Sequence, residues 1–304
     1  MYAPAHRDRP GLALLIRLGG IAGFATMAAL IKLASERGIH LAEIIFWRQL
    51  VSLPILLAWV MMNGGLMVLA TKRPGTHAVR GVYGIIGMLF NFGAVILLPL
   101  AEATTLNFTS PIWAVLLSIV LLREKVGVYR IGAVVLGFFG ILLIAQPSGD
   151  HFPLVGTLVA LGGAFMIALI SIQIRDLSRT EQPATIVFWF ATMSVVIFAP
   201  ILPFVMVPHS GEDWLLLLGI GLAGTWGQVL VTAALRYGEV SNVIVMDYSS
   251  LVWATLFGWF IFDRLPPGTT WLGAPLIVAA GLVIAWREHY LSRKVGARTD
   301  KEST

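Results

Sequence analysis

The sequence lacks cysteine, has few charges and contains no recognised nucleotide-binding or metal-binding motif. Without Cys in its 304 residues, the chain forms no disulfide and offers no thiolate to a metal. None of the six His residues belongs to an HExxH pair, so we expect no metal site, and no cofactor is indicated. The Gly-x-x-x-x-Gly-Lys-[Ser/Thr] loop is also absent, so we expect the chain not to hydrolyse ATP itself. Only 12% of the residues are charged, which points away from a water-soluble protein.

Ten apolar runs of about 18–24 residues make up most of the chain. A helix rises about 1.5 Å per residue, so roughly 20 residues cross a hydrocarbon core of about 30 Å. A soluble protein of this length has no interior for ten such helices, and the composition of 58% hydrophobic residues agrees. The sequence therefore predicts an all-α integral membrane protein with ten transmembrane helices. The predicted spans are 11–34, 44–62, 78–98, 102–122, 129–146, 153–174, 184–206, 212–235, 240–262 and 270–286.

The distribution of Lys and Arg predicts the orientation in the membrane. If the N-terminus is inside, 17 of the 21 basic residues are cytoplasmic, and only Lys32, Arg37, Arg48 and Arg264 fall outside. We therefore expect a bacterial inner membrane protein with both termini in the cytoplasm. The same distribution accounts for the net charge of +5, so the expected partners are the lipid bilayer and a small-molecule substrate, and no nucleic acid. Whether the chain pairs as a homodimer is left open.

A shift of about 140 residues partly superimposes the two halves of the chain. Single identities among apolar helices are common, but all the matched pairs need nearly the same offset. Five helices per repeat is an odd number, so the second copy enters the membrane from the opposite side. We therefore predict two inverted five-helix repeats, in residues 1–150 and in residues 151–304 with a short cytoplasmic tail. The aligned pairs include Phe46 and Phe188, Trp47 and Trp189, Gly84 and Gly221, Gly87 and Gly224, Asn91 and Gln228, Asn107 and Asp247, Trp113 and Trp253, and Gly140 and Gly281.

The most specific stretch of the chain is Leu98-Pro99-Leu100-Ala101-Glu102-Ala103-Thr104, Thr109-Ser110-Pro111-Ile112-Trp113 and Leu122-Arg123-Glu124. With these residues the chain resembles the EamA-type, ten-helix branch of the drug/metabolite transporter superfamily. The start of the second span, Phe46-Trp47-Arg48, also matches that family's pattern, whereas Leu251 replaces the Pro expected in the second copy. The resemblance implies alternating access around a substrate cavity between the repeats, lined mainly by spans one, three, four, six, eight and nine.

A few polar and aromatic residues inside the spans are candidates for substrate binding. Asn91 and Gln228 lie near the bilayer midplane, where transporter sites are usually found, and we predict that they form a central polar pair. The alternative is close helix packing, with each amide bonded across to a neighbouring helix. The deeper aromatic residues either stack on the substrate or pack against lipid and other helices. The predicted substrate-binding residues are Tyr83, Asn91, Asn107, Trp113, Gln228, Asp247 and Tyr248.

Three charged residues inside the spans have specific expectations. Asp247 is the only carboxylate well inside an apolar run, where an Asp costs about 2.5–3.5 kcal/mol on insertion scales. We predict that it carries a proton or pairs with a substrate cation and so couples transport to pH; the alternative is that it faces interfacial water. Arg48 either attracts an anionic group or extends to the headgroups, and Lys32 is expected to extend to the headgroups.

These features favour a secondary transporter of a small metabolite or drug-like solute, driven by an ion gradient, by exchange or by the substrate's own gradient. The alternative is an intramembrane enzyme acting on a lipid-soluble substrate. Such an enzyme needs a concentrated catalytic set, and one isolated Asp247 is not such a set. A channel or a structural scaffold explains an inverted repeat poorly. We therefore expect no catalytic residues.

Overall fold

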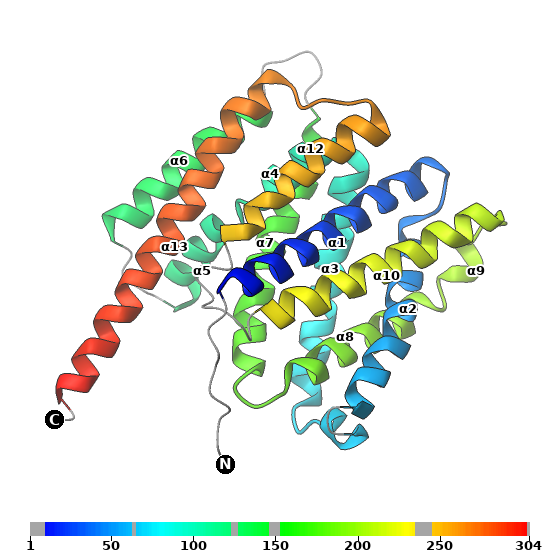
Figure 1. Ribbon diagram of the computed structural model, residues 1–304, viewed down its shortest axis with the longest axis horizontal. Helices are drawn as coiled ribbons and strands as arrows, with labels where there is room; N and C mark the ends of the chain where they lie inside the picture. The colour runs from blue at the N-terminus through cyan, green and yellow to red at the C-terminus, as the bar shows by residue number, and fades with distance from the viewer. Residues whose placement is uncertain (1–9, 63–64, 123–126, 146–152, 235–244, 303–304) are drawn as a thin grey trace.

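The computed structural model describes residues 10–62, 65–122, 127–145, 153–234 and 245–302, and these ranges contain helices and connecting segments but no strand (Figure 1). Each of the ten predicted apolar runs contains at least one helix. The α-helices are α1 (Pro10–Glu36), α2 (Leu41–Met62), α3 (Pro74–Leu97), α4 (Leu100–Asn107), α5 (Ser110–Leu122), α6 (Val128–Ala145), α7 (Leu154–Leu177), α8 (Pro183–Phe198), α9 (Leu202–Val205), α10 (Gly211–Ala234), α12 (Ser249–Phe262) and α13 (Gly268–Glu302), and the short 3-10 helices are η1 (Leu66–Leu69) and η2 (Val245–Tyr248).

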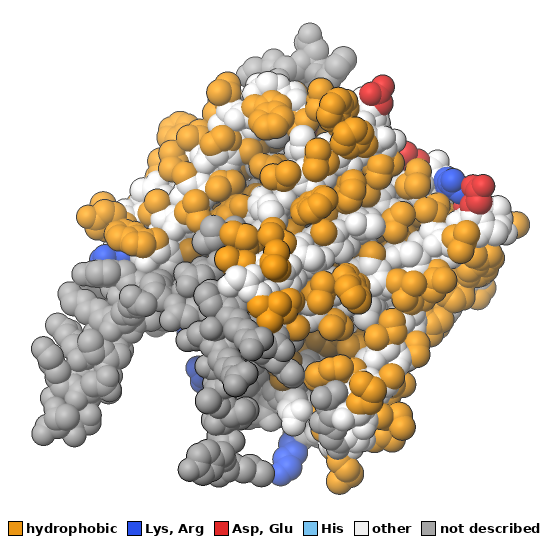
Figure 2. Space-filling view, viewed as in Figure 1, with side chains coloured by type: hydrophobic (Ala, Val, Ile, Leu, Met, Phe, Trp, Pro, Cys, Tyr) orange, Lys and Arg blue, Asp and Glu red, His pale blue; other side chains and the backbone are white. Residues whose placement is uncertain are grey.

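The protein is an integral membrane protein by the length and apolarity of its helices. Seven segments of the described chain are long and apolar enough to cross a membrane: α1, α2, α3, the α4–α5 pair taken together, α7, α10 and α13. The shorter helices α6 and α8 are also apolar. Hydrophobic side chains cover most of the described face in Figure 2, and charged side chains lie toward its rim. This surface suits lipid, because a soluble monomer rarely exposes so continuous an apolar area.

The helices pack in pairs that follow the predicted repeat. α1 lies along α10, and α3 lies along α7; these two contacts are equivalent under the repeat alignment. α2 packs on α8 and α6 on α13, so each of these helices packs on its own equivalent, and α4 packs on α12. Figure 1 shows α1 beside α10 across the front of the bundle and α6 beside α13 at one edge. The two halves of the chain therefore share one interface instead of forming separate bundles.

Glycines allow two of these pairs to approach backbone to backbone. A Cβ built on Gly140 of α6 would lie 2.8 Å from the carbonyl oxygen of Gly273 in α13, and one on Gly273 would lie 2.7 Å from the carbonyl oxygen of Gly140. Gly23 of α1 meets the backbone of Gly227 in α10 in a similar way. Such close contacts are typical of helix pairs in membranes, where small residues replace bulky knobs.

Candidate functional site

Predicted spans four and nine each depart from a single α-helix at equivalent positions. α4 ends at Asn107 and α5 begins at Ser110, followed by Pro111, which is well placed in a first helical turn because it has no N–H to leave unpaired. In the second copy, the 3-10 helix η2 ends at Tyr248 and passes directly into α12 at Ser249. Leu251 stands where Pro111 stands in the first copy. The rings of the equivalent residues Phe108 and Tyr248 are in contact, tilted by 55° with centroids 4.8 Å apart.

Three buried polar atoms without hydrogen-bond partners belong to residues in or next to these irregular positions. The Oδ1 atom of Asn107, the Nε1 atom of Trp113 and the Oγ atom of Ser249 are buried and have no hydrogen-bond partner among the described residues. The Trp113 ring lies edge-on to Phe165 of α7, with centroids 5.6 Å apart. Buried polar atoms without partners are rare because they lose water without compensation, so an acceptor and a donor here suit a bound polar solute.

Asp247 lies at the same level but is paired. Its two carboxylate oxygens accept hydrogen bonds from Nε and Nη2 of Arg17 at 2.7 and 2.6 Å, and Nη1 of Arg17 is 3.3 Å from the carbonyl oxygen of Val231. The Arg17 side chain is 10% exposed and the Asp247 side chain 39% exposed. This two-pronged geometry gives strong charge-assisted bonds. Sequence reasoning counted Arg17 only as a cytoplasmic charge and missed it as the partner of Asp247.

Lys32 does not extend to the headgroups, so that expectation was wrong. Its Nζ atom is buried and donates to the carbonyl oxygens of Val95 at 3.1 Å and Leu98 at 2.8 Å. The carbonyl of Val95 would normally accept from the N–H four residues later, but that residue is Pro99, which has none. Lys32 therefore supplies the missing donor at the C-terminus of α3, where a cation also suits the helix dipole.

Arg48 also points into the bundle, which excludes the headgroup alternative in this structure. Its Nη1 atom donates to Oε1 of Gln49 at 2.8 Å, and its Nε and Nη1 atoms contact the sulfurs of Met27 and Met88 at 3.4 and 3.3 Å. The guanidinium carbon lies 5.7 Å from the ring centre of Phe92. Arg48 thus joins α1, α2 and α3, and its role as an anion-attracting group stays a prediction.

The structure does not join Asn91 and Gln228 by any described hydrogen bond. Asn91 Nδ2 donates to the carbonyl oxygen of Gly87 at 2.8 Å and lies 3.5 Å from that of Gly163 in α7, which is the helix-packing alternative. Gln228 lines a cavity. Tyr83 is half-buried on α3. The binding roles of these residues stay predictions.

A cavity of about 1000 Å³ lies between α1, α2, α8 and α10, so both halves of the chain form its walls. These helices belong to predicted spans one, two, seven and eight, whereas the family resemblance implied mainly spans one, three, four, six, eight and nine. Of the predicted binding residues, Gln228 alone is among the residues that line it. The remaining lining is mostly apolar, with Thr26, Thr225 and Thr232 as polar points. Thr225 Oγ1 lies 2.7 Å from Ser52 Oγ where α10 meets α2.

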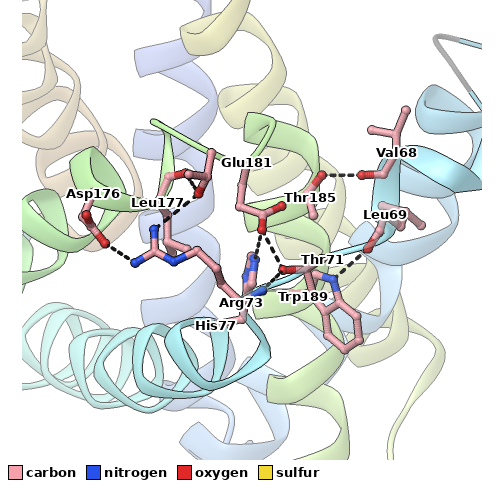
Figure 3. A network of polar contacts seen from close by, with 11 residues as sticks. Val68, Leu69, Thr71, Arg73, His77, Asp176, Leu177, Glu181, Thr185 and Trp189 are labelled. Carbon is pink, nitrogen blue, oxygen red and sulfur yellow. Dashed lines mark hydrogen bonds and ion pairs between the residues drawn. The ribbon is translucent and has the colours of Figure 1, made fainter.

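Two corner networks hold the ends of the α2–α8 pair. The first, which we call the η1 corner, joins the α2–α3 connection to the α7–α8 connection (Figure 3). Arg73 Nη2 pairs with Asp176 Oδ2 at 2.6 Å, Thr71 Oγ1 donates to Glu181 at 2.7 Å, and Trp189 Nε1 donates to the carbonyl oxygen of Leu69 at 3.0 Å. His77 Nε2 lies 3.9 Å from Glu181.

The second, the α9 corner, joins the start of α2 to the α9–α10 connection. Glu43 accepts from Trp47 Nε1 at 3.2 Å and from His209 Nε2, and the rings of Trp47 and Trp214 are 5.0 Å apart. Arg37 binds Glu212 and Asp213 at the surface, and its hydrogen bond with Asp213, then that with Glu212, raises the pKa of its guanidinium. Trp47 and Trp189 are repeat equivalents, so the two corners are equivalent contacts at opposite ends of the α2–α8 pair.

Comparison with known proteins agrees with this geometry. The model of the EamA-like transporter family matches the chain twice, over residues 11–146 and 154–286. The chain belongs to the EamA-like transporter family. Its EamA-like relatives include a riboflavin transporter of Vibrio cholerae, 30% identical over 93% of this chain and 95% of the relative, and the pseudopaline exporter CntI of Pseudomonas aeruginosa, 32% identical over 86% and 92%. The human solute carrier family 35 member G1 is 25% identical over 94% of this chain and 82% of its own length.

One solved crystal structure has the same fold, with a TM-score of 0.62 and 23% sequence identity. The match covers 92% of this EamA-like chain and 98% of the solved chain. The EamA-like family and the names of these relatives indicate a membrane transporter and not an enzyme, which sets aside the alternative of an intramembrane enzyme. Among the described residues, no group of three or more His, Asp or Glu side chains is arranged to hold a metal ion.

Proposed function

We propose that this protein is a secondary transporter that moves a small organic solute by alternating access between two inverted five-helix repeats. In this proposal the repeats are residues 1–150 and 151–304, the chain crosses a bacterial inner membrane ten times, and both termini lie in the cytoplasm. The membership of the family and the transport functions named for its relatives support the class of function. The distribution of basic residues supports the orientation.

The observation that carries the proposal is a pair of equivalent irregular positions in the helices. α4 and α5 are separated by two residues, η2 changes to α12 at the equivalent position, and the rings of Phe108 and Tyr248 are in contact there. Interrupted helices at the interface between repeats are where secondary transporters place their substrates, because the free helix ends and unpaired polar groups bind solute. The unpartnered atoms of Asn107, Trp113 and Ser249 are such groups. The cavity between α1, α2, α8 and α10 supports a path toward this centre, since both repeats line it.

Asp247 is the proposed coupling residue, with Arg17 as its partner in the conformation described here. When the repeats rearrange, Asp247 exchanges Arg17 for a proton or for a cationic group of the solute. A carboxylate that changes its partner between two conformations binds a proton with different affinity in each, and linkage then couples the transport cycle to pH. The equivalent residue in the first repeat, Asn107, cannot ionise, so the coupling is confined to one half of the chain.

The test begins with thermal unfolding of the purified protein against a panel of metabolites that includes riboflavin, since a ligand that binds the folded state raises the unfolding temperature. Compounds that shift the temperature are then assayed for uptake into proteoliposomes. We expect Asn107→Leu and Trp113→Phe to reduce both the shift and the uptake. Trp259→Phe is the matched control, because Trp259 is 48% exposed and stacks on Phe260.

Two outcomes would count against the proposal in different ways. Binding without uptake of any shifted compound would contradict transport. Normal uptake by both Asn107→Leu and Trp113→Phe would place the binding site away from the irregular positions in the helices.

A further inference from the structure

Two guanidinium groups lie along one stripe of α3. Arg80, Gly84, Met88 and Phe92 follow one another at intervals of four residues, so they share a helix face. The Nη1 atom of Arg80 occupies the space where a Cβ on Gly84 would stand. Arg48, which comes from α2, contacts Met88 and Phe92 on the same stripe. The two guanidinium groups are therefore about one helical turn apart, roughly 6 Å along the axis of α3.

Arg80 is buried without a hydrogen-bonding counterpart. Its exposed fraction is 9%, and its Nε and Nη1 atoms are sealed from solvent with no partner among the described residues. The guanidinium carbon lies 4.6 Å from the ring centre of Phe190 in α8. The ring offers its π face but accepts none of the planar N–H bonds of the guanidinium. A cation removed from water is strongly unfavourable inside a membrane protein unless a partner compensates it.

Arg48 has only neutral partners. Its donors meet one amide oxygen, from Gln49, and two thioether sulfurs, and sulfur is a weak acceptor. Gln49 in turn donates from Nε2 to Ser194 Oγ at 3.3 Å, and Ser194 Oγ donates to the carbonyl oxygen of Phe190 at 2.8 Å. These bonds fix α2 to the part of α8 that carries Phe190. Both guanidinium groups therefore lie where α2, α3 and α8 meet, a region that we call the wedge.

Several described carboxylates of the bundle are bound elsewhere, and Glu102 of α4 lies within the electrostatic reach of Lys32. Arg17, Arg37 and Arg73 each form an ion pair with an Asp or Glu, but no described ion pair includes Arg48 or Arg80. Glu43 is bound by Trp47 and His209 in the α9 corner, and Glu181 accepts from Thr71 in the η1 corner. The charges of Arg48 and Arg80 are therefore not neutralised by the described part of the chain.

We propose that Arg48 and Arg80 bind the anionic group of the transported solute, a carboxylate or a phosphate attached to an apolar body. Planar guanidinium groups match carboxylate and phosphate oxygens, and two of them one turn apart reach opposite sides of one such group. The apolar body follows from the neighbours, which are Met88, Phe92 and Phe190 around the charges. This inference rests on the proposed transport function and adds the charge of the substrate to it.

The experiment measures binding to the purified full chain in detergent, which does not depend on transport. Thermal unfolding is recorded with 3-phenylpropionate and phenyl phosphate as anions, 3-phenylpropionamide as the neutral probe and 3-phenylpropylammonium as the cation. We expect both anions, or one of them, to raise the unfolding temperature of the wild type, and the neutral and cationic probes to leave it unchanged. The stronger of the two anions distinguishes a phosphate site from a carboxylate site.

Variants assign the response to the two residues. Arg48→Gln and Arg80→Gln should each require roughly tenfold more anion for the same shift, because a charge-assisted bond is lost. Arg37→Gln is the control, since Arg37 binds surface carboxylates outside the wedge, and it should respond as the wild type does. Without ligand, Arg80→Gln should unfold at or above the temperature of the wild type, because it removes an uncompensated buried charge.

Equal responses to all four probes, no response to either anion, or an undiminished anion response in both Gln variants would overturn the proposal. A ligand-free Arg80→Gln protein that unfolds well below the wild type would also overturn it, since Arg80 would then have a structural partner. If any of these results is found and proteoliposomes still take up a neutral solute, the anion site is refuted but the transport function is not. Selective anion binding with no transport of any solute refutes the transport function alone.

Discussion

Replacing Gly140 by Ala tests the backbone contact between α6 and α13. The added Cβ would lie 2.8 Å from the carbonyl oxygen of Gly273 and 2.7 Å from Cγ1 of Ile277. Ile277 is fully buried, so its side chain has little room to move, and the carbonyl belongs to the backbone. Relief therefore requires the two helices to separate by roughly 0.7 Å, since ordinary carbon contacts lie near 3.5 Å.

The expected cost of this separation is about 1–3 kcal/mol, as for other overpacked interiors. For a chain of this size each kcal/mol lowers the unfolding temperature by about 2–4 °C, so Gly140→Ala should unfold roughly 2–12 °C below the wild type. Gly132→Ala is the control on the same helix: no atom lies within 4 Å of its added Cβ, and Ala favours helix over Gly.

The assay is the loss of the monodisperse peak in size-exclusion chromatography after heating, with both variants and the wild type in the same detergent. Gly132→Ala should match or exceed the wild type. Equal unfolding temperatures for Gly140→Ala and Gly132→Ala would refute the reasoning, because they would show that α6 and α13 do not pack at the described distance.

Three further predictions follow from other contacts. Lys32→Met should lower the free energy of unfolding by about 2–4 kcal/mol, because it leaves the C-terminal carbonyls of α3 unpaired. The control is Lys72→Met, at an exposed site. Equal stability of the two variants in the heating assay would contradict the capping role of Lys32. In a double-mutant cycle of unfolding free energies, Arg17→Gln and Asp247→Asn should show an interaction energy of about 1–2 kcal/mol, which is less than for a fully buried pair because Asp247 is 39% exposed. Asp247→Asn should also flatten the pH dependence of uptake. Strictly additive effects together with an unchanged pH profile would refute both the ion pair and the coupling of transport to pH. A Cys placed at Lys72 in this cysteine-free chain should react with an impermeant reagent only from the cytoplasmic side, and labelling of intact cells from outside would reverse the orientation.

The arrangement of helices was largely predictable because apolar length and a constant offset both survive in the sequence. The interruption before Ser110 also has a local signal in Pro111. The change from 3-10 helix to α-helix at Ser249 has no such signal, because Leu251 replaces the proline, and only the alignment of the repeats points to it. The contact between Tyr248 and Phe108 lies at this change.

The partners of buried charges were not predictable by the same means. Arg17 and Asp247 are 230 residues apart, so their pairing depends on how α1 packs against η2. Part of the role of Lys32 does have a local signal, because Pro99 deprives the carbonyl of Val95 of its donor. Which cation replaces that donor is decided by the packing of α1 against α3.

The walls of the cavity were missed for a different reason. Sequence reasoning searched for polar residues within apolar spans, and α2 and α8 contribute mostly apolar side chains to the cavity, such as Leu56 and Val187. An apolar wall cannot be told from a lipid-facing surface by composition alone, because both carry the same residues. The orientation of the helix, which only the packing determines, separates the two.

Phe108 and Tyr248 are equivalent residues that contact each other. Because both belong to one chain, their surroundings can differ, which is not possible in a symmetric dimer. In an antiparallel pair of identical five-helix chains, a residue at this position would meet its own copy across the dyad, and every neighbouring substitution would occur twice. The aspartate at position 247 would then face a second aspartate at position 107, and each would need its own arginine. Joining the two copies in one polypeptide frees Asn107 to stay neutral while Asp247 carries a charge and Arg17 neutralises it. The covalent link therefore allows an ion pair to form at only one of two equivalent positions in an otherwise two-fold scaffold.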